Sequence, residues 1–286
     1  MMMSMACFAV EDTFIKLLSA RLPATQILFS IGFGGALITL VLAIVLNVNL
    51  ADKILLNKHV ISRTIADLFG ALSFTSAMVL IPMSLLASIL QATPLFVTLG
   101  AAILLREKVG WRRWSAIFIG FLGVIIILQP GYGSFQLASL LGLAAVLCLA
   151  LRDVVTRDMA TEIPTLTVTF YACLAMGSAG FIAYPFFGPP IMPTTYETII
   201  LICAAIIGLT GYFLLVLATR KGDVSVIAPF RYSRLLFSLG LASLILGEKL
   251  TLPILLGGLL VVSSGIYTFG RERRLVKIQK SVNQKT

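Results

Sequence analysis

The first apolar segment of the chain contains three ionisable residues that are costly inside a membrane. Glu11, Asp12 and Lys16 interrupt a run of apolar residues from Met1 to Leu22. A charged side chain at membrane depth needs a partner or an aqueous cavity, so it is by default a candidate functional residue. The two carboxylates can hold a cationic group or a coupled proton. The alternative is a structural ion pair, because Asp12 and Lys16 are one helical turn apart.

A second charged stretch occurs 141 residues further on. At this offset Asp12 aligns with Asp153, whereas Glu11 aligns with Arg152. The chain has 286 residues, close to twice the offset, which indicates an internal duplication. Arg152 and Asp153 are therefore candidates for the same site as the first pair. An acid and a base at equivalent positions, Glu11 and Arg152, can pair across the interface of the two repeats.

A later apolar segment carries two arginines, Arg231 and Arg234, which are three residues apart and share one face of the expected helix. A guanidinium group is a planar fork of donors that can hold a carboxylate or a phosphate through two hydrogen bonds. Tyr232 lies between the two arginines and is a candidate for the same substrate site, and Pro229 is close by. The alternative is that the arginines neutralise the intramembrane acids Glu11, Asp12, Asp67 and Asp153.

Three further polar residues interrupt apolar segments of the first half. Asp67 has no acidic counterpart, because the equivalent residue is Gly208. It is a candidate for proton coupling, although a structural ion pair is the favoured interpretation. Gln91 and Thr93 lie next to Pro94 in the middle of a long apolar segment. A proline there removes a backbone hydrogen bond and kinks the helix, so both side chains are candidates to bind substrate at the kink.

The composition is that of an integral membrane protein. Hydrophobic residues make up 59% of the chain and charged residues 12%, and the mean hydropathy is +1.03, whereas a soluble domain has roughly 25% charged residues. His59 is the sole histidine, and the four cysteines lack paired spacing, so neither a metal nor a cofactor is expected. No nucleophile–base pair or phosphate-binding glycine loop occurs, and we expect no enzymatic activity.

Ten apolar segments have about the length needed to span a membrane. They are expected at residues 2–18, 24–46, 63–81, 83–105, 114–128, 135–157, 165–187, 196–219, 224–247 and 251–269. This predicts an all-α fold with two five-helix repeats, at residues 1–134 and 135–270, and a basic, partly disordered cytoplasmic tail at 271–286. Because five is odd, the second repeat is inverted relative to the first. Gly32, Gly34 and Gly35 indicate close helix packing in the second segment.

The basic residues predict how the chain is oriented. The net charge is +10, but most lysines and arginines, Arg63 among them, fall in loops and the tail on one side of the expected bundle. This distribution argues against a nucleic-acid partner and follows the excess of basic residues on the cytoplasmic side of membrane proteins. We therefore expect a multi-pass protein of the bacterial inner membrane with both termini in the cytoplasm.

Two pairs of motifs resemble a known family of transporters. Residues 92–97 (ATPLFV) followed by 105–108 (LREK), and the second copy at 246–250 (LGEKL), are similar to the signature of the EamA family in the drug/metabolite transporter superfamily. The resemblance implies ten helices in two repeats. It also implies a transporter of amino acids, purines, vitamins or other metabolites, in either direction.

Within this signature, Glu107 and Glu248 are interpreted as caps that hold helix ends rather than as ligands. The second copy also departs from the pattern. It has Leu235 where the first copy has Pro94, and its proline is Pro229. We therefore expect the two central helices to bend differently.

The sequence thus predicts a secondary transporter that works by alternating access. The mixed charges favour a small polar or zwitterionic, amino-acid-like metabolite. The alternative is uptake of a vitamin or nucleoside-like metabolite such as riboflavin or S-adenosylmethionine, and a passive channel is the less favoured class. The helices expected first, third, fourth, sixth, eighth and ninth should line one cavity. The expected partners are the metabolite, the lipid bilayer and a proton as candidate coupling ion, and the expected state is a monomer or a weak homodimer.

Overall fold

The computed structural model describes residues 1–50, 58–104, 111–129, 136–157, 164–186, 190–221 and 228–283. The helices of the first half are α1 (Met2–Leu18), α2 (Ala24–Val45), α3 (Lys58–Leu80), α4 (Met83–Leu90), α5 (Thr93–Leu104) and α6 (Trp111–Leu128). Those of the second half are α7 (Ser139–Arg157), α8 (Thr165–Ala183), η2 (Tyr184–Phe186), α9 (Thr195–Lys221), η3 (Ala228–Tyr232), α11 (Ser233–Leu244) and α12 (Leu252–Asn283). In these ranges the helices form ten units when α4–α5, α8–η2 and η3–α11 each count as one.

Prolines start several of the helices. Pro23, Pro82 and Pro164 are the residues directly before α2, α4 and α8, and each has an extended backbone, with ψ between 140° and 144°. Proline is tolerated at a helix start because its missing N–H has no partner there in any case. At the other end of α2, Asn47 adopts a positive φ of 51°, a conformation that asparagine tolerates better than most residues.

The fourth helix is interrupted, and the ninth changes from a 3₁₀ turn to an α-helix; both places are called breaks below. α4 ends at Leu90 and α5 begins at Thr93, which confirms the predicted kink beside Pro94. The described part of the ninth helix begins as the 3₁₀ turn η3 and becomes α-helical at Ser233; residues 222–227, where its start was expected, lie outside the described ranges. The two breaks fall at equivalent places in the repeats, although the prolines that accompany them do not.

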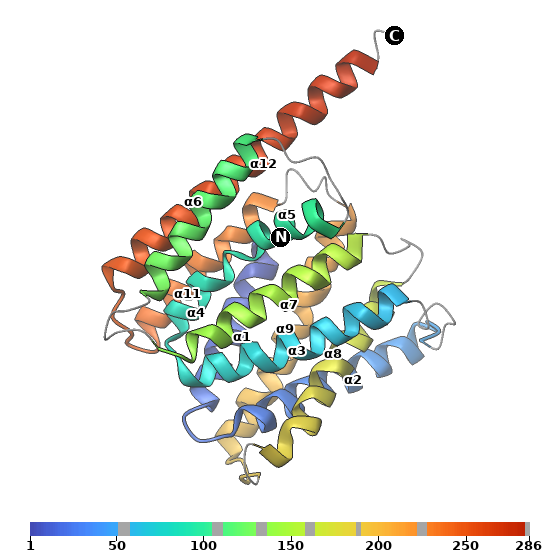
Figure 1. Cartoon of the computed structure of the whole chain (residues 1–286). Helices are drawn as coiled ribbons and strands as arrows, with labels where there is room; N and C mark the ends of the chain where they lie inside the picture. Colours follow the sequence, from blue (N-terminus) through green and yellow to red (C-terminus); the bar gives the residue numbers. More distant parts are fainter. Residues whose placement is uncertain are drawn as a thin grey trace.

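The tail differs from the prediction of partial disorder, because α12 continues as a helix to Asn283 and extends beyond the bundle (Figure 1). After Gly270 this stretch contains neither glycine nor proline and is rich in Arg and Lys. These are good helix formers, so the chain has no local signal to end the helix.

Adjacent charged residues lie in two of the helices, α1 and α7. Five spans in the described part of the chain are long and apolar enough to cross a membrane, namely Ala24–Val45, Ile61–Leu80, Met83–Gly100, Thr165–Ala183 and Thr195–Ala218. The equivalent helices α1 and α7, which carry Glu11, Asp12, Arg152 and Asp153, are not among them. We therefore expect their polar faces to lie against protein rather than lipid.

The packing of the helices repeats when the two halves are exchanged. α2 packs against its equivalent α8, and α6 against its equivalent α12, on opposite flanks of the molecule (Figure 1). The contact of α3 with α7 likewise has its counterpart in that of α1 with α9. The fold is thus an all-α membrane protein built from two inverted five-helix repeats, whose elements interlock in one bundle.

Glycines allow the closest of these contacts. A Cβ atom at Gly32 of α2 would overlap the backbone of Gly177 in α8, and one at Gly123 of α6 would meet the carbonyl of Gly257 in α12. Membrane helices pack closely where small residues let their backbones approach. The predicted packing role of Gly32 is confirmed.

Candidate substrate cavity

A cavity of about 230 Å³ lies in the middle of the bundle. It is lined by residues of α1, α2, α3, α4–α5, α7, α8, α9, η3 and α11. The expectation that the first, third, fourth, sixth, eighth and ninth helices line one cavity is confirmed, and α2 and α8 also contribute. Of the ten residues predicted for the site, all except Asp153 and Tyr232 line it. Ligand sites usually measure roughly 300–1,000 Å³, so the cavity fits a small molecule rather than a macromolecule.

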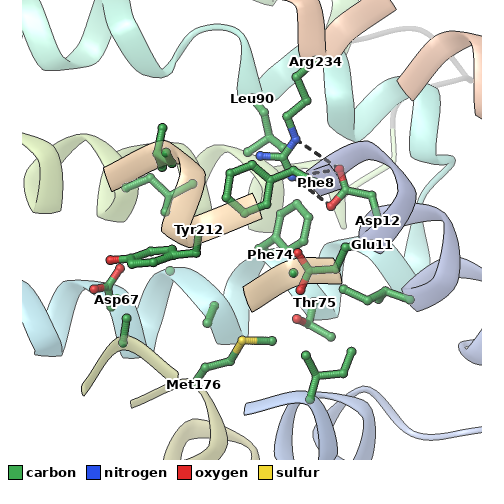
Figure 2. Close-up of a pocket in the computed structure, with 18 of the residues that line it drawn as sticks. Phe8, Glu11, Asp12, Asp67, Phe74, Thr75, Leu90, Met176, Tyr212 and Arg234 are labelled. Atoms are coloured by element: carbon green, nitrogen blue, oxygen red, sulfur yellow. Dashed lines mark hydrogen bonds and ion pairs between the residues drawn. The ribbon is translucent and has the colours of Figure 1, made fainter. Parts of the chain in front are cut away.

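Asp12 and Arg234 form a buried ion pair at one side of the cavity. Arg234 Nη2 lies 2.8 Å from both carboxylate oxygens of Asp12, and Nε donates to Oδ2 at 3.2 Å. The Asp12 side chain is 3% exposed. The guanidinium also lies 5.2 Å from the ring centroid of Phe8 and 5.8 Å from that of Phe74, as Figure 2 shows. Several charge-assisted bonds and two aromatic faces offset the cost of burying the arginine.

Lys16 does not pair with Asp12, so the alternative of an intrahelical ion pair is wrong for these two residues. Its Nζ donates to the carbonyl oxygens of Met78 at 2.8 Å and Ile81 at 2.7 Å, at the end of α3. A cation at the C-terminus of a helix satisfies unpaired carbonyls and the helix dipole. Asp12 is therefore paired with Arg234 of the other repeat.

A second ionic cluster lies at the other side of the cavity. Arg152 donates from Nε and Nη2 to Asp153 Oδ1, at 2.9 and 2.8 Å, and from Nη1 to Asp67 Oδ1 at 3.2 Å. Arg231 donates from Nη2 to Asp153 Oδ2 at 3.1 Å. Asp153 thus contributes as a partner of two cavity arginines, although its own side chain does not line the cavity.

Arg63 and Tyr212 complete this cluster, and the sequence analysis missed both. Arg63 Nη1 lies 3.2 Å from Asp67 Oδ2, and Nη2 donates to the Tyr212 hydroxyl. Arg63 had been interpreted as a basic residue flanking the membrane, yet it is only 6% exposed. Its spacing of four residues from Asp67 on the same helix was the available signal. Tyr212 had none, because it is one aromatic residue in an apolar helix.

Glu11 differs from the other acids of the cavity. In the described part of the chain its carboxylate makes no hydrogen bond or ion pair with another residue. It lies directly against the backbone of Gly208 in α9. A Cβ atom added at Gly208 would overlap both oxygens of the Glu11 carboxylate. The predicted pair of Glu11 with Arg152 is wrong, because Arg152 is engaged by Asp67 and Asp153 on its own side.

The two helix breaks contact each other. The Gln91 side-chain amide donates to the carbonyl of Tyr232 at 3.2 Å, and the two residues are equivalent positions of the repeats. Thr93 Oγ1 donates to the carbonyl of Leu90 at 2.7 Å. Both polar side chains therefore satisfy carbonyls freed by the breaks. The Tyr232 ring is 4% exposed and packs against Gly265 of α12, away from the cavity.

A polar latch joins the two repeats, by which we mean the contacts of Lys16 and Glu248 with the turn between α3 and α4. The Glu248 carboxylate accepts from the backbone N–H groups of Met83 at 2.7 Å and Ser84 at 2.9 Å. Glu248 thus caps a helix, as predicted, although the helix belongs to the other repeat; Glu107 lies outside the described residues.

A core of buried apolar side chains lies next to this latch. It includes Ile15, Met78, Leu86 and Ile89, each at most 2% exposed. α4 packs on α11, whereas α5 packs on α7 and η3 on α12. One part of each broken helix, α4 and α11, therefore contacts the other. The remaining parts, α5 and η3, contact α7 and α12.

Comparison with known proteins identifies the class. The EamA-like transporter family matches residues 1–129 and 136–269, which is nearly all of the chain. The chain therefore belongs to the EamA-like transporter family. Its multi-pass helical bundle and its charged central cavity agree with this assignment.

Three relatives and one solved structure are similar to this chain. An S-adenosylmethionine uptake transporter of Rickettsia prowazekii is 23% identical over 96% of this chain and 92% of that protein. A pseudopaline exporter of Pseudomonas aeruginosa is 25% identical over 89% of both chains. A riboflavin transporter of Vibrio cholerae is 31% identical, over 52% of this chain and 49% of that protein. A solved crystal structure with a TM-score of 0.62 and 18% identity covers 96% of this chain and 98% of that one, and shows the same fold.

Proposed function

We propose that this protein is a secondary transporter that carries a small zwitterionic metabolite across the bacterial inner membrane by alternating access. The observation that carries the proposal is the cavity itself, because it combines arginines and carboxylates from both repeats at the centre of an inverted-repeat fold. In such folds the substrate site lies between the repeats, and one half moves against the other around it.

S-adenosylmethionine is the first substrate to test. It combines an amino acid with a sulfonium and an adenine ring, so it is both zwitterionic and nucleoside-like. The transporter of this compound in Rickettsia prowazekii aligns with 96% of the present chain. The cavity offers ionic groups for the amino-acid part and the apolar side chains of Met5, Ile31 and Met176 for the ring.

Riboflavin is the second candidate. It is supported by the 31% identity to the Vibrio cholerae transporter over half of this chain and by the aromatic side chains of Phe8 and Phe74 in the cavity wall. Its ring system lacks a positive charge. The excess of ionic groups in the cavity therefore favours S-adenosylmethionine.

The contacts of the latch must break during the conformational change. To expose the cavity at the latch, the turn between α3 and α4 must leave Lys16 and Glu248, and α4 must separate from α11. The contacts involved are a few charge-assisted hydrogen bonds, which are modest enough to break within a transport cycle. The basic loops support a latch that faces the periplasm and termini in the cytoplasm. The cavity lies within one chain, which supports a monomer as the transporting unit.

Counterflow in proteoliposomes tests this proposal. Vesicles loaded with unlabelled S-adenosylmethionine should transiently accumulate the labelled compound against its gradient, because a carrier exchanges one molecule for another. Parallel vesicles loaded with riboflavin or methionine rank the candidates. A passive channel gives equilibration without accumulation. Absence of counterflow with all three compounds would refute the proposal.

A further inference from the structure

We infer that Glu11 binds the cationic group of the substrate, and that Gly208 provides the space for its carboxylate. This inference rests on the proposed transport function and narrows the substrate class. It selects metabolites in which a sulfonium or ammonium group is separated from a carboxylate, and it disfavours neutral ring compounds.

The other acids of the cavity network are each paired with arginines. Asp12 is held by Arg234, Asp67 by Arg63 and Arg152, and Asp153 by Arg152 and Arg231; the ion pairs are those of residues 12–234, 67–63, 67–152, 153–152 and 153–231. Among the described residues that line the cavity, Glu11 is the acid with no basic side chain in contact. A carboxylate inside a membrane protein is costly without a counter-charge. A cationic ligand or a proton supplies that charge.

Gly208 leaves room for the Glu11 carboxylate in α9. By the offset of the repeats, Glu11 on Gly208 corresponds to Arg152 on Asp67. In the second pair the two side chains neutralise each other. In the first pair the partner position has no side chain, so the Glu11 carboxylate lies on bare backbone and presents its charge to the cavity. Any residue larger than glycine at 208 would displace it.

Few titratable groups lie near the Glu11 carboxylate. The titratable groups that act on its carboxylate are Asp12 of the same helix, Arg234 of α11 and Cys173 of α8. Arg234 is already bound by Asp12 through both oxygens. Figure 2 shows Glu11 beside Phe74 and Thr75, on the opposite side of the view from Asp67 and Tyr212. Glu11 therefore faces the cavity without a hydrogen bond or ion pair to any of these groups.

The opposite side of the cavity completes the recognition. There the guanidinium groups of Arg63, Arg152 and Arg231 surround the carboxylates of Asp67 and Asp153, the acids with which the described ion pairs join them. The Arg231 side chain is 30% exposed, the largest fraction among the paired cavity groups. A zwitterion can thus place its cationic group at Glu11 and its carboxylate at Arg231, along the charge gradient of the cavity.

The experiment measures binding to the purified, full-length protein in detergent. The probes are S-adenosylmethionine, S-adenosylhomocysteine, which lacks the sulfonium charge, and riboflavin, which is neutral at its ring. Glu11→Gln keeps the size of the side chain and removes its charge. We expect it to weaken S-adenosylmethionine binding about tenfold or more, since a charge-assisted hydrogen bond is worth at least a factor of ten. The melting temperature should stay close to that of the wild type.

Two more variants keep the test decisive if Glu11→Gln folds poorly. Gly208→Ala retains every charge but displaces the carboxylate, so it should weaken S-adenosylmethionine binding as well. Glu197→Gln is the matched control, because Glu197 lies at the start of α9 and pairs with the exposed Arg21 outside the cavity. It should leave binding unchanged.

The outcomes separate this inference from the proposed function. The inference alone would be overturned by two results together. The wild type would show counterflow of S-adenosylmethionine, and Glu11→Gln and Gly208→Ala would bind this compound within twofold of the wild-type affinity. Equal losses for riboflavin and S-adenosylmethionine would also overturn it, because they would indicate general damage to the cavity. Absence of both binding and counterflow with every probe in the wild type would overturn the proposed function.

Discussion

The two sides of the cavity are related by the internal repeat, yet their electrostatics differ. Around Asp67, Arg63 of the same helix and Arg152 of α7 pair with its carboxylate, and Arg152 also joins Asp67 to Asp153. Around Gly208, the equivalent position, the side chain is absent and Glu11 stands without a basic partner among the described residues. The backbones correspond, whereas the charges at the equivalent positions are reversed or missing.

This difference shows how a symmetric fold can acquire an asymmetric site. The repeat places α1 against α9 in the same way as α7 against α3. Two exchanges between the copies, glutamate for arginine and glycine for aspartate, change one side from a self-neutralised network into an acidic surface. The duplication therefore supplies the geometry of the cavity, and single residues at equivalent positions supply its polarity.

The largest effect is expected when the Gly208 side is made to resemble the Asp67 side. Gly208→Asp would place a second carboxylate in contact with Glu11, so two like charges would be buried without a partner. We expect a loss of about 3–5 kcal/mol in the free energy of unfolding, measured by denaturant unfolding in mixed micelles.

The double variant Glu11→Arg, Gly208→Asp sharpens the same comparison, since it copies the Arg152–Asp67 pair into the other repeat. It should recover much of the lost stability and still fail to transport S-adenosylmethionine. Equal instability of the single and double variants would contradict the electrostatic correspondence of the two sides.

The next largest effect concerns the network that neutralises itself. Arg152→Gln removes the residue that joins Asp67 to Asp153, although Arg63 and Arg231 remain. We expect a loss of about 1.5–3 kcal/mol in the free energy of unfolding, the value of hydrogen bonds to charged groups. The added substitution Asp67→Asn should restore part of it. A neutral effect of Arg152→Gln would mean that the network does not stabilise the fold.

Arg231→Lys separates binding from stability on the same side. Lysine keeps the charge near Asp153 but lacks the planar fork of the guanidinium. Because Arg231 has one hydrogen bond to Asp153, the melting temperature should change little, whereas S-adenosylmethionine affinity should fall roughly tenfold. Isothermal titration measures the affinity. Wild-type affinity in this variant would remove Arg231 from the binding site.

The smallest effect is expected at the latch. Glu248→Gln weakens the cap on α4 by about 1 kcal/mol, which should raise the population of the open latch roughly fivefold. Maleimide labelling of Ala87→Cys, buried at 5% exposure in α4, reports this opening after the four natural cysteines are replaced. Glu197→Gln is the control and should label at the wild-type rate. Unchanged labelling of Glu248→Gln would show that the cap does not hold the closed state.

The sequence by itself determined the membrane class, the duplication and the position of the break beside Pro94. These follow from local or periodic properties, namely the apolar content of each segment, the equivalence of Asp12 with Asp153, and the proline beside Gln91. The same information identified nearly all of the polar residues that line the cavity, because a charged residue in an apolar segment is unusual wherever it lies.

Only the tertiary structure decided which charges pair. Asp12 has Lys16 one turn away in sequence, yet it binds Arg234, which is 222 residues distant. Lys16 is drawn instead to the carbonyls at the end of α3, and Arg63 proved to be buried rather than peripheral. The electrostatic energy of a charge depends on its distance from all other charges and on its exposure to water. Both quantities are set by how the helices pack, and that is why Glu11 could be distinguished from the other acids only in the folded protein.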